Sequence, residues 1–233
     1  MNNNLLQIKI KQRLNKLASH DYDNIECWQI AEVFNKVQLE WVRRQLHGGN
    51  AYKEADGQSK RRIDDLQILL TTYPLKMTDE GVYYQSCDIP EDYLEFKRIA
   101  ASAVDDCCPK RPLAVYLADE SDTDVLLKDA LKQPSFEWAE TFGSLFGNTV
   151  RIYTNGSFEV VDPSLVYFRK PRSVEFKDCQ NPNTGASFSA DVTCEFKDDI
   201  VEILIDETAA VLAADIESQF QYQVRTAQAE KNN

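Results

Sequence analysis

Glycine, proline and histidine are scarce in this sequence, which has 8 glycines, 8 prolines and only 2 histidines in 233 residues. So few glycines and prolines exclude the collagen-like and low-complexity classes of protein. His20 and His47 lie in polar surroundings near expected helix ends, where we interpret them as exposed capping residues rather than ligands or general bases. The histidines therefore give no support to histidine-based catalysis.

The sequence also lacks the spacing motifs of common catalytic and binding sites. It contains no Cys-x-x-Cys or His-Glu-x-x-His pattern, no P-loop, no nucleophile elbow and no dinucleotide-binding glycine run. Gly143 and Gly147 stand four residues apart, but a third glycine and a strand-to-helix context are missing, so we expect a turn there. The sequence therefore predicts a protein that is not an enzyme, with no catalytic residue, no metal-binding residue and no cofactor.

Long apolar runs are absent as well. No stretch approaches the about 18 to 20 apolar residues that a membrane span needs, and the N-terminal residues lack the apolar core and cleavage site of a signal peptide. We therefore expect a protein that is made and kept in a cytosol and has no membrane contact. In that compartment the six irregularly spaced cysteines are expected to be free thiols; they are Cys27, Cys87, Cys107, Cys108, Cys179 and Cys194.

Basic residues are outnumbered, with 26 Lys and Arg against 38 Asp and Glu, a net charge of −12. Such a surface repels phosphate backbones and disfavours a DNA-binding protein that reads sequence. The acid is most concentrated in residues 178–233, which favours a surface along which nucleic acid slides without sticking, or simply a soluble acidic domain. Carboxylates cluster in Asp119-Glu120-Ser121-Asp122 and Asp198-Asp199. These clusters fit either a divalent-cation site or ordinary helix caps and solvated helix faces.

The composition, 43% hydrophobic and 27% charged, is that of an ordinary folded protein, and its periodicity predicts helices near both ends. A helix over about 24–46 is opened by Asp23 and Glu26, in capping-box spacing, and is stopped by Gly48-Gly49. Asp198-Asp199 opens a last helix that we expect to reach about Gln228. Further helices are predicted over 4–18, 61–71 and 121–131, with a mobile loop over 48–60.

The middle of the chain, rich in Tyr, Phe and Val and punctuated by Pro and Gly, predicts strands. Asn155-Gly156 favours the positive φ angles of a two-residue hairpin turn between two of them. The expected fold is α+β, a helical bundle formed by the N- and C-terminal helices with an antiparallel β insert. Its expected parts are 1–72, helical; 73–177, β-rich with one helix; and 178–233, a linker and the C-terminal helix packed back on the N-terminal helices. The expected strands cover 82–86, 93–102, 113–118, 149–153, 157–161 and 165–170.

Several segments resemble virion structural proteins of tailed bacteriophages. They include the helix ending in Trp41-Val42-Arg43-Arg44 and the strand entry Ile89-Pro90-Glu91-Asp92-Tyr93-Leu94. The middle of the chain is similar to the β insert of head-to-tail connector (adaptor) proteins of short-tailed phages of the crAss-like group. This likeness is carried by 132–138 (KQPSFEW), 150–158 (VRIYTNGSF) and 166–171 (VYFRKP), and the helix from Ile200 to Gln228 also fits.

The resemblance implies a portal-binding ring protein, a homo-oligomer of about twelve copies (a dodecamer), that joins the portal to the tail and forms part of the DNA channel. Its partners would be itself, the portal and neighbouring tail or ring proteins, and passing double-stranded DNA without sequence recognition. It would reside in the neck or tail of the virion after assembly in the host cytoplasm. The alternatives are another tail or capsid-associated virion protein, or a cytosolic carboxylate-dependent metal enzyme.

The residues that we expect at subunit or portal interfaces come from the two terminal helices. Trp28, Phe34 and Trp41 are predicted packing anchors, although each aromatic side chain also fits an ordinary core position. Arg43 and Arg44 are expected to face a neighbour at a helix end. The last predicted helix supplies a docking tail with Phe220, Tyr222 and Arg225.

Overall fold

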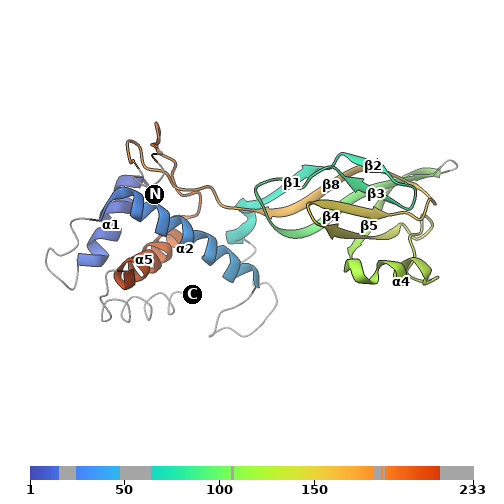
Figure 1. Cartoon of the computed structure of the whole chain (residues 1–233), viewed down its shortest axis with the longest axis horizontal. Coiled ribbons are helices and arrows are strands. Elements are labelled where there is room, and N and C mark those ends of the chain that lie inside the picture. Colours follow the sequence, from blue (N-terminus) through green and yellow to red (C-terminus); the bar gives the residue numbers. More distant parts are fainter. Residues whose placement is uncertain (16–24, 48–63, 106–107, 181–184, 186, 216–233) are drawn as a thin grey trace. The chain divides into compact units, whose positions relative to one another are not determined.

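A computed structural model describes residues 1–15, 25–47, 64–105, 108–180, 185 and 187–215 (Figure 1). The chain divides into two compact units. One, called here the helical unit, contains residues 1–68 and 171–233, and the other, the sheet unit, contains residues 69–170. Each unit is described by itself below.

In the described part of the helical unit, α5 (Asp198–Asp215) packs against both α1 (Asn3–Asn15) and α2 (Cys27–His47). The predicted helix over 24–46 is confirmed, and so is the opening of the last helix at Asp198-Asp199. α5 is buried over nearly its whole circumference, because apolar side chains occupy most of its faces. The expected continuation of this helix to Gln228 lies outside the described residues.

Ion pairs fix the charged side chains of α5 against its neighbours. Arg13 of α1 contacts Glu202, at 2.9 Å from Nη2, and also Asp206, while Arg44 of α2 contacts Glu207. Asp206 and Glu207 are both buried. A buried carboxylate needs a charged partner, so these pairs make the position of α5 specific.

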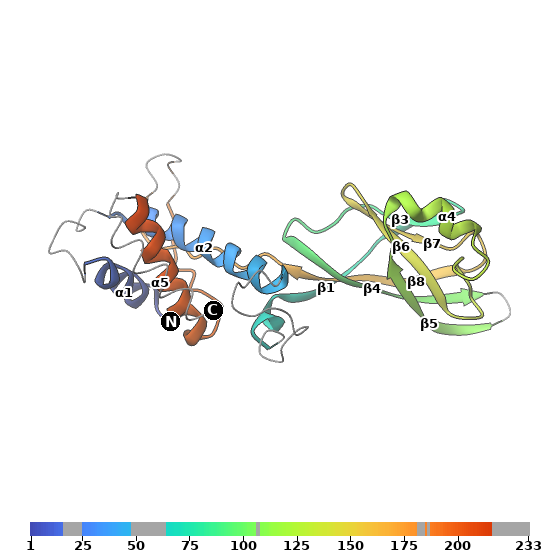
Figure 2. The same cartoon turned by 90° about the horizontal axis from the view of Figure 1, so that it is seen from below.

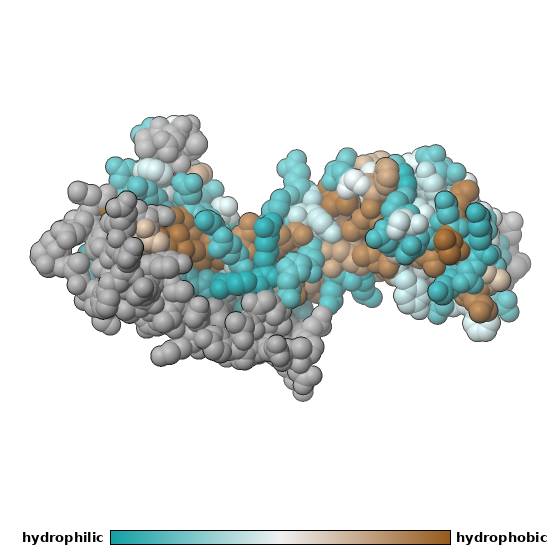
Figure 3. All heavy atoms as spheres, turned by 60° about the horizontal axis from the view of Figure 1, so that its bottom comes forward, coloured by the Kyte–Doolittle hydropathy of each residue, from teal (hydrophilic) through white to brown (hydrophobic). Residues whose placement is uncertain are grey.

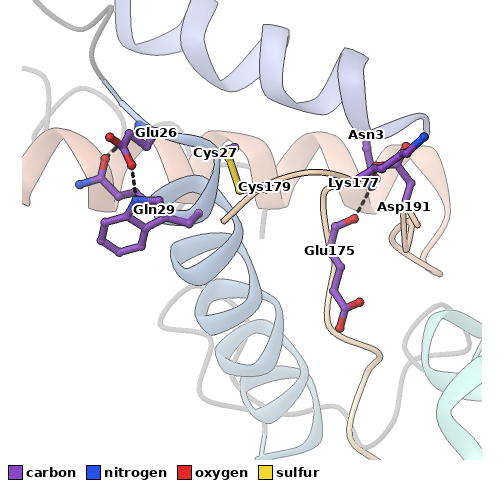
Figure 4. Close-up of a disulfide and its surroundings, with 9 residues drawn as sticks. Asn3, Glu26, Cys27, Gln29, Glu175, Lys177, Cys179 and Asp191 are labelled. Atoms are coloured by element: carbon purple, nitrogen blue, oxygen red, sulfur yellow. Dashed lines mark hydrogen bonds between the residues drawn. A yellow bond between two sulfur atoms is a disulfide. The ribbon is translucent and has the colours of Figure 1, made fainter. Parts of the chain in front are cut away.

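A disulfide joins Cys27, at the start of α2, to Cys179, with their Cα atoms 6.0 Å apart (Figure 4). The expectation that all six cysteines are free thiols is therefore wrong for these two. Cys87 and Cys194 are free thiols, and Cys107 lies outside the described residues.

Amide side chains of the helices hold the segment that follows the sheet unit. Asn35 of α2 both donates to the carbonyl of Val174 (3.0 Å) and accepts from its N–H (2.7 Å), as a neighbouring strand would. Asn3 of α1 donates to the carbonyl of Glu175 at 2.8 Å (Figure 4). The Asn35 contacts satisfy both backbone groups of the buried Val174, whereas the Glu175 carbonyl also accepts from the N–H of Val192 at 2.9 Å.

The sheet unit is one eight-stranded sheet in the order β1-β8-β4-β5-β6-β7-β3-β2 (Figures 1 and 2). Every neighbouring pair is antiparallel except β5 and β6, which are parallel. The strands are β1 (Leu70–Pro74), β2 (Met77–Asp79), β3 (Tyr83–Ser86), β4 (Tyr93–Asp105), β5 (Cys108–Leu117), β6 (Glu140–Phe146), β7 (Thr149–Tyr153) and β8 (Glu159–Arg169).

Bulges curl this sheet around its own core. The pairing of β4 with β8 shifts register three times, and each bulge increases the local twist and bends the strand. The concave side encloses apolar side chains from both ends of the sheet order, among them Leu75, Ile99, Val150, Ile152 and Leu165. Within the described residues, the curled sheet therefore encloses a core of its own.

The predicted fold class, a helical bundle with an antiparallel β insert, is wrong. A curled, mixed sheet of eight strands dominates the described chain, and it includes a parallel pair. Part of the error is local. Residues 70–71, expected at the end of a helix, begin β1, and the turn expected at Gly143 is the middle of β6.

The turn at Asn155-Gly156 has the predicted conformation but not the predicted partners. Both residues have positive φ, 52° and 68°. However, β7 pairs with β3 and β6, whereas β8 pairs with β1 and β4, so the two strands that flank the turn are not a hairpin. The turn instead carries the chain from one part of the sheet order to another.

Candidate functional site

The connection from Ala118 to Ala139, between the parallel strands β5 and β6, builds the most distinctive surface of the sheet unit. A parallel pair cannot be closed by a tight turn and needs a crossover. This crossover contains η2 (Glu120–Asp122) and α4 (Thr123–Lys128). Glu120 anchors it to the sheet, because its carboxylate contacts Arg151 Nη1 of β7 at 2.6 Å and also accepts from the hydroxyl of Ser144.

Trp138 stands at the tip of a tight turn just before β6. Ser135 and Glu140 close this turn with two backbone hydrogen bonds of 2.9 and 3.1 Å, and Ala139 has a φ of 53°. The Trp138 N–H donates to Ser135 Oγ at 3.4 Å. The turn is thus fixed from within, yet 77% of Trp138 is exposed.

Arg111 of β5 contacts the same turn through stacking and hydrogen bonds. Its guanidinium lies 4.5 Å from the ring centroid of Phe136 and donates from Nη1 to the carbonyls of Phe136 and Glu137, each at 3.2 Å. A stacked and hydrogen-bonded guanidinium is rigid. Arg111 therefore helps to position the Trp138 turn on the sheet, together with the backbone N–H of Ala114, which donates to the carbonyl of Ala139 at 2.8 Å.

Leu131 is also held in an exposed position by a hydrogen-bonded turn, in the segment that follows α4. Its N–H donates to the side chain of Asp129 at 2.9 Å, and the Asp129 carbonyl accepts from the N–H groups of Lys132 (3.1 Å) and Gln133 (2.9 Å). Leu131 is 94% exposed. Because this turn keeps the leucine side chain in solvent, the side chain lacks the favourable free energy that burial usually provides.

These two turns line one groove of about 840 Å³, whose other apolar walls are Tyr116 and Leu117 of β5, Leu126 of α4 and Phe142 of β6. Tyr116 and Leu117 are also exposed, by 57% and 47%. Figure 3 shows apolar side chains open to solvent on the face of the sheet unit that it displays. We call this feature the 116–142 groove.

Acidic side chains dominate the charge of the groove. Asp119, Asp122, Glu137 and Glu140 line it, against the single basic residue Lys132. The N–H and hydroxyl of Ser121 donate to Asp119, and these hydrogen bonds lower the pKa of its carboxyl. The negative charge of Glu140, which accepts from the Tyr116 hydroxyl at 3.2 Å, raises the pKa of that phenol. The groove is therefore negatively charged at neutral pH.

The exposed apolar side chains and charged rim of this groove are features of an interaction surface. Exposed apolar patches with a polar rim mark interaction sites in soluble proteins. Tryptophan is enriched among the residues that carry most of the binding energy of interfaces, and a rigid turn lowers the entropy lost on binding. The arrangement fits a protein-docking surface whose anchors are Trp138 and Leu131.

The structure places the predicted interface residues of α2 mostly inside the helical unit. Phe34 and Trp41 are buried there, and Trp41 packs edge-to-face on Phe196 at 5.3 Å. Trp28 is half-buried and donates to the carboxylate of Glu26. Arg43 is exposed, whereas Arg44 pairs with Glu207. The predicted docking tail with Phe220, Tyr222 and Arg225 lies outside the described residues, as do Asp23 of the expected capping box and the loop over 48–60.

Sequence reasoning missed Trp138 and Leu131 as surface anchors. Leu131 was expected to end a helix over 121–131, but α4 ends at Lys128 and Leu131 lies in the turn that follows. For Leu131 a signal was present, since Pro134 shortly after it disfavours helix there.

Among the described residues, no group of three His, Cys, Asp or Glu side chains is placed to hold a metal ion. None of the helices in the described ranges is both long and apolar enough to cross a membrane.

Comparison with known proteins gives no family to which the chain can be assigned. No protein-family model matches the sequence. No curated protein matches it significantly either.

Proposed function

We propose that this protein is a structural subunit of a bacteriophage virion, a head-to-tail connector that forms a ring between portal and tail and catalyses nothing. The observation that carries the proposal is the 116–142 groove, in which Trp138 and Leu131 are 77% and 94% exposed on hydrogen-bonded turns. Side chains held in this way suit assembly with other proteins.

Two features of the sequence support the more specific identity. The segments 132–138 and 150–158 resemble the β insert of connector proteins of crAss-like phages, and the first of them forms the Trp138 turn. The net charge of −12, concentrated in residues 178–233, suits a channel through which DNA moves without adhering. The ring would contain about twelve copies joined by heterologous contacts.

The competing hypothesis from a different class is a carboxylate-dependent metal enzyme, and one experiment separates the two. We would measure the mass of the purified protein by light scattering at several concentrations, with and without magnesium. A ring subunit gives a mass that rises steeply with concentration toward about twelve times 26.7 kDa, independently of magnesium. A 26.7 kDa monomer whose melting temperature rises with magnesium would overturn the proposal in favour of the enzyme.

A further inference from the structure

We infer that the 116–142 groove binds an amphipathic segment of a different protein, one that carries Lys or Arg beside its apolar side chains. The inference rests on the proposed function, because a connector must hold at least one partner other than itself. The partner is thereby specified as apolar and cationic, and its binding surface as the 116–142 groove.

The two apolar anchors of the groove are preorganised for binding. Trp138 and Leu131 belong to separate turns, and each turn is closed by its own hydrogen bonds of 2.9 to 3.1 Å. Arg111 fixes the first turn to β5. An incoming segment therefore meets a preformed site and loses little free energy in ordering it. A helix that lays its apolar face into a groove is a recurring mode of such recognition.

The charge of the groove selects the sign of the charge on its partner. Four carboxylates and one lysine line the groove, which gives a net charge of −3. Asp122 makes no capping hydrogen bond to α4, and 122 and 137 are both exposed positions, so their charges face solvent. Lys or Arg side chains at the edge of a docked apolar face would complement these carboxylates. A nucleic acid would be repelled by the same charges.

A second copy of this chain fits the groove less well. Each copy carries a net charge of −12, so a second copy brings mostly like charge to the acidic groove, and the contacts between copies of a ring are expected on other surfaces. The cationic side chains Lys9 and Arg13 of α1 already pair with acids of α5. The groove therefore favours a cationic partner of different sequence.

The test uses the full-length protein and two fluorescently labelled peptides of about 14 residues, long enough for a helix of about 21 Å. Both peptides carry Leu at helical spacing; one has Lys and the other Glu at all remaining charged positions. The Lys peptide should bind at least about tenfold more tightly than the Glu peptide at moderate salt. Trp138→Ala should weaken the binding of the Lys peptide at least about tenfold. Because Trp138 is exposed, this variant keeps its fold.

Matched variants separate groove binding from general attraction to an acidic protein. Val125→Ala removes another exposed apolar side chain of α4, one outside the groove, and should change the affinity less than about twofold. Asp122→Asn with Glu137→Gln should weaken binding about fivefold or more. Asp124→Asn with Glu91→Gln, which alters the net charge equally at exposed positions outside the groove, should leave the affinity within about twofold of the wild-type value.

Three results would overturn the inference. These are equal binding of the two peptides, equal loss of affinity in the groove and control variants, and a wild-type oligomer that Trp138→Ala dissociates while Val125→Ala does not. The last result would assign the groove to a second copy. If the peptide experiment fails but the protein has a ring-sized mass in solution, the inference about the groove is wrong and the proposed function stands. If the peptide binds as expected but the protein is always a monomer, the proposed function alone is contradicted.

Discussion

At the scale of the residue, Gly143 occupies a position in a strand where neighbouring atoms leave no room for a side chain. It lies in the middle of β6, where a Cβ atom would come within 2.7 Å of the Arg151 carbonyl oxygen and 3.0 Å of Ile99 Cδ1. Glycine weakens a strand in general, but here it permits the close approach of β7 and of the core. The sequence pattern alone indicates a turn at this position, because the reason for the glycine is a tertiary contact.

Gly143→Ala should therefore destabilise the sheet unit by about 1–3 kcal/mol, since neither a carbonyl oxygen nor a core methyl group can move away freely. Urea unfolding followed by circular dichroism would measure the change. Ala114→Ser, which adds an atom at an exposed position of the neighbouring β5, should stay within about 0.5 kcal/mol of the wild type. Equal stabilities of the wild type and Gly143→Ala would show that the contact is relaxed in solution.

Tyr116 and Glu140 give a pH-dependent signature of the groove. The negative charge of Glu140 raises the pKa of the Tyr116 phenol above its ordinary value near 10. The contribution of this contact to stability is therefore present below pH about 10 and is lost as the pH rises through the higher pKa of the folded protein. Glu140→Gln should lower the pKa of Tyr116 toward 10.

The absorbance of the phenolate reports this titration, and subtraction of the Tyr116→Phe titration isolates the residue. Glu137→Gln, also in the groove, is the control because Glu137 is not a cause of the shift. An unchanged midpoint in Glu140→Gln would mean that the Tyr116 hydroxyl does not contact Glu140.

At the scale of helices and strands, the sequence pattern predicts an element well where residues close in sequence determine it. The helix from Cys27 to His47 and the strand from Thr149 to Tyr153 follow from apolar periodicity and turn residues, and both are found close to the predicted positions. β1 begins within the segment predicted as the helix over 61–71, and β2, with three residues, is too short to show a period of two. The segments 157–161 and 165–170, predicted as separate strands, form the single long β8. Pro163 near its middle suggested a break, but the strand continues through it.

The disulfide between Cys27 and Cys179 lies beyond any local pattern, because 152 residues separate the two cysteines. It ties the first turn of α2 to the segment that follows the sheet unit, and it should stabilise the helical unit by restricting the unfolded chain. Reduction, or Cys179→Ser, should lower the stability of this unit by about 2–5 kcal/mol.

Thermal unfolding with and without a reductant would measure the effect of this disulfide. Cys87→Ser replaces an exposed free thiol and should leave the melting temperature and its response to reductant unchanged. If reductant did not lower the melting temperature of the wild type, the two thiols would not be bonded in the purified protein.

At the scale of the whole molecule, the sequence predicts which elements exist better than it predicts how they combine. The parallel pairing of β5 with β6 depends on the crossover from Ala118 to Ala139, and no local pattern distinguishes that pairing from a hairpin. The curl of the sheet comes from register shifts in β4 and β8, which are set by the core. The groove depends on the same crossover, so its anchors could not be assigned to one surface before the sheet order was known.

A connector ring is a closed assembly, which imaging of single particles would show. Negative-stain electron microscopy of the purified protein at rising concentration, alone and mixed with a phage portal protein, should show closed rings with a central channel and about twelve repeats. Rings should also form in the Trp138→Ala variant, because the groove is assigned to a different partner. Single 26.7 kDa particles under every condition, with no ring on the portal, would contradict the account.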